Sequence, residues 1–419
     1  MQADKKDALL KDSIIMFAAT SIVNLSNFGF HMYATRSLGP EGYGILAAML
    51  GLLVIVSMPA VSLQLTLAKK TAVFKAHERF GSIEHLFKKA SKWFFFLGVG
   101  YFVFFFLTAD LLGTFLNIDD KILVYILGMI SIASLLMPVV RGILQGLQKF
   151  IGLGANLIID AVLRIVFLFL FIWFGWGVRG AMGASFFSAL CAFAAGFAVL
   201  SFIFRYKEEN ADVITKRELF KYAFPVFFSM LGLSVLSYLD LIMVKHFYSR
   251  EEAGFYAVTS IVGKAFLFFP GAVVMTLFPK VSEQHELNRD TIKMLYKGLA
   301  LTAGISAIGI AFCFFLPDFV IWMLAGGGRY YEISGVVKVF GAAILPLVLF
   351  NVVINYSLAV QKYTFIYIMF AGIMAYAALL WFFHGSFFQV LAILFIVNLV
   401  ILAASLISLG IKTKRRTDF

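Results

Sequence analysis

The chain has 419 residues, of which 62% are apolar and only 14% are charged, and its formal net charge is +12. A soluble domain has about 45–50% apolar and about 25% charged residues, so this composition excludes a soluble protein. The apolar runs are long and continuous, whereas the strands of a membrane barrel alternate over about 10 residues. The sequence therefore predicts an all-α integral membrane protein.

A short charged segment opens the chain. Its first twelve residues hold three lysines and three aspartates, and a long apolar run follows without an evident small-residue cleavage site. We therefore expect a retained first span rather than a cleaved signal peptide. Apolar stretches near the length of about 20 residues that crosses the hydrocarbon core recur along the whole chain. Twelve spans are predicted, at 13–35, 44–67, 93–116, 122–140, 154–174, 181–204, 222–244, 254–277, 298–317, 336–358, 363–383 and 387–411.

Lysine and arginine are unevenly distributed between the predicted connections. With the N-terminus inside, 26 of the 35 lie in inner segments, seven lie in outer segments, and Arg164 and Lys264 lie within spans. This bias predicts that both termini are cytoplasmic. The basic loops then face anionic membrane lipids, so the net charge does not indicate nucleic-acid binding. The longest hydrophilic segments are also cytoplasmic, at 69–92, 205–221 and 278–297.

Short stretches of sequence recur at a spacing close to half the chain length. Six spans in each half is an even number, so both halves enter the membrane from the same side and the repeats are parallel. We predict two six-helix bundles, residues 1–210 and 211–419, with the substrate path between them. The recurring stretches are 41–44 with 251–254, Thr66-Leu67 with Thr276-Leu277, Lys70 with Lys280, and 147–150 with 360–363.

Ionisable residues inside spans are costly, so each one is a candidate functional residue. Asp160 and Arg164 are four residues apart, which places them on one helix face. They form either a self-neutralising pair that stabilises the bundle or an arginine that lines a cavity and is held by its aspartate. Lys264 either pairs with another span, for instance through Asp240, or faces a polar lumen, which is the alternative we favour. Asp240 has Lys264 or Lys245 as its candidate partner.

Further polar residues gather on two spans. Asn27 and His31 belong to a stripe on span 1, and Asn351 and Asn355 recur at i, i+4 on span 10. Such stripes form hydrogen bonds between helices or line a polar cavity. Arg36 and Arg141 lie at span ends, where arginines either snorkel to the interface or join that cavity.

A net-cationic cavity of these residues would suit a phosphate or pyrophosphate, which arginine and lysine bind through charge and hydrogen bonds.

Several kinds of chemistry have no motif in the chain. The run Gly326-Gly327-Gly328-Arg329 lacks the Lys-Ser/Thr ending of a phosphate loop, and we read it as an outer turn. Neither Cys191 nor Cys313 indicates a disulfide or a metal. We predict no enzyme, no catalytic residue, no metal and no cofactor. Transport would then use an Na⁺ or H⁺ gradient, the substrate gradient, or coupling to another protein, with Asp160 and Asp240 as candidate ion-coupling residues.

Motifs in both halves resemble one family. The segment ATRSLGPEGYG at 34–44 resembles the N-terminal signature of bacterial polysaccharide transporters, which are lipid-linked oligosaccharide flippases of the MATE-like (MOP) exporter superfamily. The second half is similar to that family in YLDLIM at 238–243, EEAGFY at 251–256, GRYY at 328–331 and VQK at 360–362.

This resemblance implies two six-helix bundles in a V around a central cavity that opens to each side in turn. It implies a cargo of undecaprenyl-pyrophosphate-linked oligosaccharide, moved from the inner to the outer leaflet of a bacterial cytoplasmic membrane for polysaccharide export. Other polysaccharide-assembly proteins would be potential partners. The family's cationic cavity residues would correspond to Arg164 and Lys264, with Arg141 and Arg36 as further candidates.

Two alternatives stay open at this point. A cation-coupled multidrug exporter of the same superfamily would need an acidic cavity, and the acidic residues Asp160 and Asp240 lie beside basic ones. A membrane polymerase or ligase for the same glycans would need outer-face residues such as Arg329 and Lys338, but the outer connections are short.

Overall fold

The computed structural model describes residues 2–206, 216–268, 273, 280–285, 287 and 289–414, and helices form nearly all of this part of the chain. The chain divides into two compact units, Met1–Phe227 and Phe228–Phe419. The predicted boundary between residues 210 and 211 lies outside the described residues, so the division of the chain into bundles at that point stays a prediction.

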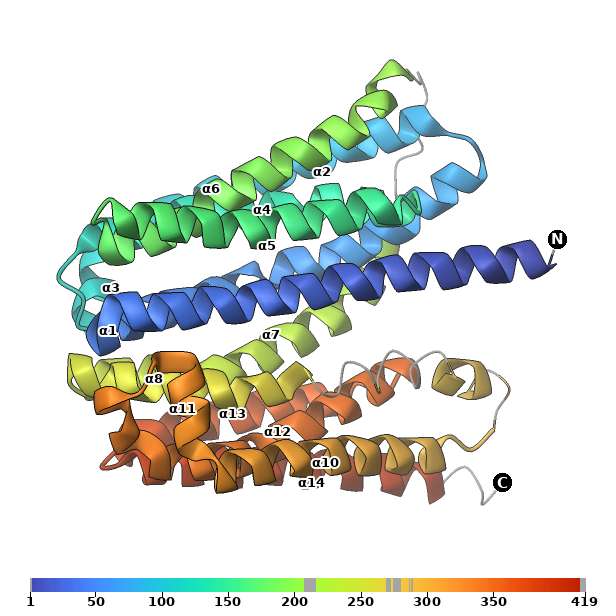
Figure 1. Cartoon of the computed structure of the whole chain (residues 1–419). Coiled ribbons are helices and arrows are strands. Elements are labelled where there is room, and N and C mark those ends of the chain that lie inside the picture. The colour runs from blue at the N-terminus through green and yellow to red at the C-terminus, as the bar shows by residue number, and fades with distance from the viewer. Residues whose placement is uncertain are drawn as a thin grey trace. The chain divides into compact units, whose positions relative to one another are not determined.

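The N-terminal unit is an antiparallel helix bundle (Figure 1). Helix α7 continues from this unit into the next. In chain order the elements are α1 (Gln2–Ala76), α2 (Phe80–Leu107), α3 (Ala109–Phe115), α4 (Lys121–Gly146), α5 (Phe150–Trp173), α6 (Gly177–Leu200), η1 (Ser201–Arg205) and α7 (Lys216–Phe247).

The C-terminal unit is also built mainly of helices in its described residues. Its elements are the greater part of α7, then α8 (Arg250–Ala265), η2 (Phe266–Phe268), α10 (Ile292–Phe315), α11 (Pro317–Ala325), η3 (Gly328–Ile333), α12 (Ser334–Ala359), α13 (Thr364–Phe382) and α14 (Phe387–Lys414).

Helix α1 contains two predicted spans. At 1.5 Å per residue its 75 residues would reach about 110 Å, far more than the ~30 Å hydrocarbon core. The helix breaks at Gly39, whose φ of 68° lies in the left-handed region that favours glycine. Beyond Gly39 the ribbon turns back, giving a first arm up to Gly39 and a second arm after it (Figure 1). The hydroxyl of Tyr43 lies 3.1 Å from His31 Nδ1, which ties the two arms together.

Ten helices in the described part of the chain are long and apolar enough to cross a membrane. Since one of them is the two-armed α1, they account for eleven of the twelve predicted spans. The twelfth, 254–277, begins in α8, and its end falls largely outside the described residues. Helices α1 and α2 continue through most of the hydrophilic segment 69–92 and leave only a short turn near Glu78.

The two halves share a backbone turn that the sequence match at 147–150 and 360–363 anticipates. After α4, Gln148 adopts φ 58° and the amide of Lys149 donates to Leu144 O at 3.0 Å. After α12, Gln361 adopts φ 54° and the amide of Lys362 donates to Ser357 O at 2.9 Å. Both are Schellman-type helix ends, unusual in placing a glutamine at the left-handed position. The element order also recurs, since a short helix precedes both α4 and α12.

Close helix contacts in the N-terminal unit depend on glycine. A Cβ on Gly146 of α4 would lie 2.4 Å from Ala68 O and 2.5 Å from Thr71 Cβ, both on the second arm of α1. We expect Gly146→Ala to lower the free energy of unfolding by about 1–3 kcal/mol, because the two backbones must move apart. Thermal unfolding in detergent measures this loss. Gly100→Ala on α2, where a Cβ meets open space, is the matched control and should not destabilise the protein. Equal stability of both variants would contradict the expectation.

Candidate functional site

A charged cluster lies where α4, α5 and α6 meet in the N-terminal unit. Small residues on α6 allow this approach, because a Cβ at Gly196 would lie 2.3 Å from Val140 Cγ1 and 2.8 Å from Asn156 Nδ2. Ser188 and Ala192 continue this small, buried face. Polar side chains of α4 and α5 therefore reach one another and the backbone of α6.

Asp160 on α5 binds an arginine of a neighbouring helix. Arg141 Nη2 donates to Asp160 Oδ2 at 2.8 Å, and Arg141 Nε donates to Asn156 Oδ1 at 2.9 Å. Asn156 Nδ2 in turn donates to Ala192 O on α6 at 2.6 Å. Arg141 therefore does not snorkel to the membrane interface. It connects α4 to α5, and Asn156 extends this connection to α6.

The second carboxylate oxygen of Asp160, Oδ1, makes two longer contacts. Ser188 Oγ donates to Asp160 Oδ1 at 3.1 Å, and Arg164 Nη2 lies 3.4 Å from the same oxygen. Arg164 Nε is buried without a hydrogen-bond partner among the described residues. Three of the predicted site residues, Arg141, Asp160 and Arg164, thus lie in one cluster.

The cluster carries more positive than negative charge. Two guanidinium groups share one carboxylate, which leaves one positive charge without a countercharge inside the cluster. The side chains of Arg141 and Asp160 are 18% and 12% exposed, whereas Arg164 is 30% exposed. Arg164 is therefore the arginine with both accessible surface and unused donors, which are the features that bind a phosphate or carboxylate group.

The C-terminal unit holds a separate buried cluster. Tyr256 on α8 donates through its hydroxyl to Asp240 Oδ2 on α7 at 2.8 Å. Lys264 Nζ lies 3.8 Å from Asp240 Oδ1 and 4.3 Å from the centre of the Tyr238 ring. The side chains of Lys264 and Asp240 are only 11% and 2% exposed. The structure thus places Lys264 against Asp240 rather than in the open polar lumen that we favoured.

The other predicted residues lie outside these two clusters. Asn355 Nδ2 donates to the side-chain oxygen of Asn351 at 3.0 Å, so this pair is satisfied within α12. Asn27 is half-buried one turn before His31 on α1. Arg36 is exposed near the end of the first arm of α1. Their roles in substrate binding stay predictions.

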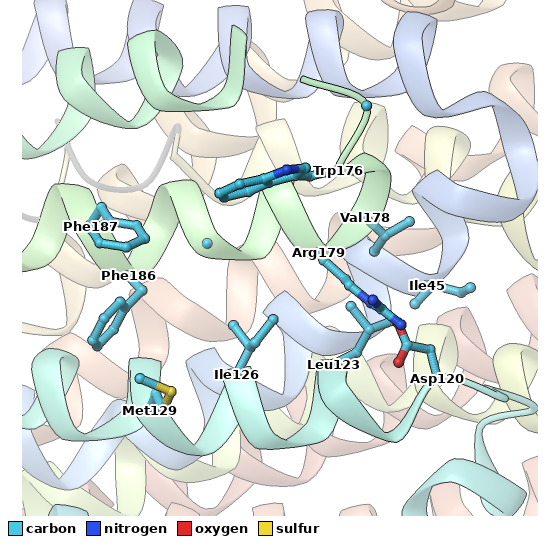
Figure 2. A pocket seen from close by; sticks show the side chains of 12 residues that line it. Ile45, Asp120, Leu123, Ile126, Met129, Trp176, Val178, Arg179, Phe186 and Phe187 are labelled. Carbon is cyan, nitrogen blue, oxygen red and sulfur yellow. The ribbon is translucent and has the colours of Figure 1, made fainter. Parts of the chain in front are cut away.

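A pocket of about 760 Å³ lies in the N-terminal unit between the beginnings of α4 and α6 (Figure 2). Its walls are aliphatic and aromatic, with Met129, Phe186 and Phe187 at one end. At the other end Arg179 Nε donates to Asp120 Oδ2 at 2.5 Å. None of the predicted site residues lines this pocket, so the pocket and the charged cluster are different features of the bundle.

Sequence reasoning missed three polar residues that build the clusters. Asn156 precedes Asp160 by four residues as Asp160 precedes Arg164, so extending the same helix face by one turn would have found it. Ser188 and Tyr256 carry no comparable signal, because serine and tyrosine are ordinary in membrane helices. In the described part of the chain, no group of three or more His, Cys, Asp or Glu side chains is placed to hold a metal ion.

Three comparisons with known proteins bear on these features. The family model described as polysaccharide biosynthesis protein matches residues 9–285. A relative described as an uncharacterized membrane protein of Methanocaldococcus jannaschii is 22% identical over 326 residues, covering 74% of this chain and 75% of its own.

Solved structures with a similar fold include an inward-facing multidrug resistance MATE family transporter of the MOP superfamily. That structure has a TM-score of 0.78 and 11% identity over 97% of this chain and 99% of its own. The lipid II flippase MurJ in an inward closed conformation has a TM-score of 0.72 and 14% identity, and the match covers 95% of this chain and 87% of its own.

The fold and the charged groups inside its helices define the class of protein. The chain is a multi-pass membrane protein, and its fold is similar to that of MATE-like transporters of the MOP superfamily. Within that class it belongs to the polysaccharide biosynthesis protein family, because the family model matches well over half of the chain. This finding confirms the membership that the sequence motifs predicted.

Proposed function

We propose that this protein moves an anionic lipid-linked oligosaccharide from the cytoplasmic to the outer leaflet of the membrane. The polar head would cross beside the helices while the lipid tail stays in the bilayer. Arg164 would bind the phosphate or pyrophosphate of the head group. Both termini would lie in the cytoplasm, as the distribution of lysine and arginine indicates.

The observation that carries this proposal is the net positive charge of the Arg141–Asp160–Arg164 cluster. Arginines within a bilayer-spanning bundle are costly and are kept where they serve a substrate path or a structural pair. Arg141 has the contacts of a structural pair, since two of its nitrogens bind buried acceptors. Arg164 has one long contact, an unused buried donor and an exposed surface. These properties support a role in recognising an anion.

Asp240 and Lys264 support a proposal about charge compensation in the C-terminal unit. Their carboxylate and ammonium are 3.8 Å apart, and neither Asp240 Oδ1 nor Lys264 Nζ has a hydrogen-bond partner among the described residues. We infer that this loose pair is where a proton or Na⁺ would act if transport is coupled to an ion gradient. The membership of the chain in a polysaccharide biosynthesis family also makes other assembly proteins plausible partners.

A cation-coupled multidrug exporter is the second candidate, since a solved structure of this fold is a multidrug resistance transporter. Such a protein would recognise cationic drugs through acidic groups. Here Asp160 is shared by two arginines and Asp240 is engaged by Tyr256 and Lys264, so neither carboxylate is left to bind a cationic drug. Drug resistance that is lost on deletion while surface polysaccharide stays normal would favour the exporter.

The proposal is tested with purified protein in liposomes that contain an undecaprenyl-pyrophosphate-linked oligosaccharide. A glycosidase added outside cleaves only the sugar in the outer leaflet, so its access to inner-leaflet substrate reports transbilayer movement, with and without Na⁺ and proton gradients. We expect wild-type protein to move the substrate and Arg164→Ala to reduce the rate at least tenfold, because the anion loses its charged donor.

Arg179→Ala is the matched control, since Arg179 is an arginine of the same unit that pairs with an aspartate away from the cluster. It should keep the wild-type rate. No movement by wild-type protein under any gradient would overturn the proposed function. Equal rates for wild type and Arg164→Ala would overturn the role of Arg164 alone.

A further inference from the structure

The two oxygens of Asp160 differ in how firmly they are held. Oδ2 binds Arg141 at 2.8 Å, and Arg141 is fixed again by Asn156, which is itself anchored on α6. Oδ1 binds Ser188 at 3.1 Å and meets Arg164 only at 3.4 Å, near the limit of a hydrogen bond. The contact of Asp160 with Arg164 is therefore the weakest in the cluster.

Breaking that weak contact does not leave Asp160 without a countercharge. Asp160 would keep the guanidinium of Arg141 and the hydroxyl of Ser188. Arg164 would gain freedom to turn its donors, including the unpartnered Nε, toward another anion. Removing a partner from a buried charge costs several kcal/mol when nothing replaces it, and here the replacement is already in place.

We propose that Asp160 is an internal counter-ion for Arg164, which the phosphate group of the substrate displaces when it binds. This inference rests on the proposed function and assigns Asp160 a specific part in it. In the absence of substrate, Asp160 occupies Arg164. In its presence, Arg164 exchanges a carboxylate for a phosphate while Arg141 stays on Asp160.

Such competition limits the affinity for the anion and so favours its release. A pathway conducts only when binding is favourable enough for entry and weak enough for departure. Without Asp160, Arg141 and Arg164 together would present two positive charges to one phosphate group. With Asp160 present, only one net positive charge faces the substrate. Asp160 thus acts as a positioning residue that sets how tightly Arg164 holds its ligand.

The test measures binding of farnesyl pyrophosphate, a short-chain polyprenyl pyrophosphate, to the full-length protein in detergent by calorimetry. Asp160→Asn keeps an oxygen that accepts hydrogen bonds but removes the competing charge. We expect it to lower the Kd about three- to tenfold and to slow transbilayer movement of the lipid-linked oligosaccharide, because release becomes slower. Asp120→Asn is the matched control, since it removes one negative charge from another aspartate–arginine pair of the same unit. It should leave the Kd unchanged.

Ser188→Ala gives a second test of opposite sign that leaves every charge in place. Without the serine hydroxyl, Asp160 Oδ1 is free to hold Arg164 more closely, so the Kd should rise about two- to threefold. This variant decides the matter if Asp160→Asn does not fold.

The outcomes separate this inference from the proposed function. If wild-type protein neither binds the pyrophosphate nor moves the lipid-linked substrate, both fail. If wild type binds it, Arg164→Ala loses binding, and Asp160→Asn binds no more tightly than wild type, the counter-ion role fails while the flippase stands. A lower Kd for Ser188→Ala would likewise overturn the counter-ion role.

Discussion

Asparagine in place of Asp240 should lower the free energy of unfolding by about 3–5 kcal/mol, because it leaves the ammonium of Lys264 buried without a countercharge. Asp240 and Lys264 are almost wholly enclosed in the C-terminal unit, with their charged atoms 3.8 Å apart. Methionine in place of Lys264 should cost a similar amount. The double variant Asp240→Asn/Lys264→Met should recover most of the loss, since it is uncharged and similar in shape, and the asparagine oxygen still accepts from Tyr256.

Wild type, the two single variants and the double variant form a double-mutant cycle. Their free energies of unfolding, measured in mixed micelles with a rising fraction of denaturing detergent, give the coupling energy between Asp240 and Lys264. Glu251→Gln is the matched control, because Glu251 pairs with Arg329 at 2.7 Å on an exposed surface. Its loss should be below about 1 kcal/mol. If Asp240→Asn alone is as stable as wild type, the aspartate carries no charge in the folded protein and the ion pair is not what holds α7 to α8.

A second large effect is expected at Arg141. Arg141→Met should lower the free energy of unfolding by about 3–5 kcal/mol, because Asp160 loses its strongest contact and Asn156 loses a buried donor. Arg164→Met should cost about 1 kcal/mol or less, since its contact with Asp160 is long and its side chain is partly exposed. The two substitutions are chemically identical, so the comparison isolates the contacts that each arginine makes.

The same micelle titration measures both arginine variants, and binding of farnesyl pyrophosphate to each one separates structure from recognition. We expect Arg164→Met to be stable and to bind poorly. Equal losses of stability at the two positions would contradict the division between a structural and a substrate-facing arginine.

The Asp160–Arg164 spacing predicted only one contact of the charged cluster. The sequence placed both residues on one face of a helix, and the 3.4 Å contact agrees with that spacing. It did not reveal that Asp160 binds Arg141 of another helix more closely than it binds Arg164. Periodicity along one helix determines which residues share a face. Which neighbouring helix packs against that face, and which of its residues point toward it, depends on tertiary packing. In this bundle, packing depends in turn on small residues such as Gly196.

Lys264 illustrates the same limit. We favoured a polar lumen over a pair with another span for Lys264, whereas its partner Asp240 lies on α7, 24 positions away in the chain. Asp240 was named as a candidate partner from its type alone. Choosing between the two alternatives required the distance between α7 and α8, which no local pattern encodes.

The sequence by itself determined the class of protein, the family and the order of the eleven predicted spans that the described helices contain, because hydrophobic length, charge bias and ordered motifs are local properties of the chain. It also anticipated the repeat, which reappears as the left-handed Gln148 and Gln361 at matching helix ends. Only the tertiary structure decided which charges meet: Arg141 with Asp160, and Lys264 with Asp240. Those pairings join different helices. The energy of a buried charge depends on its distance from the opposite charge, and side-chain packing between the helices sets that distance.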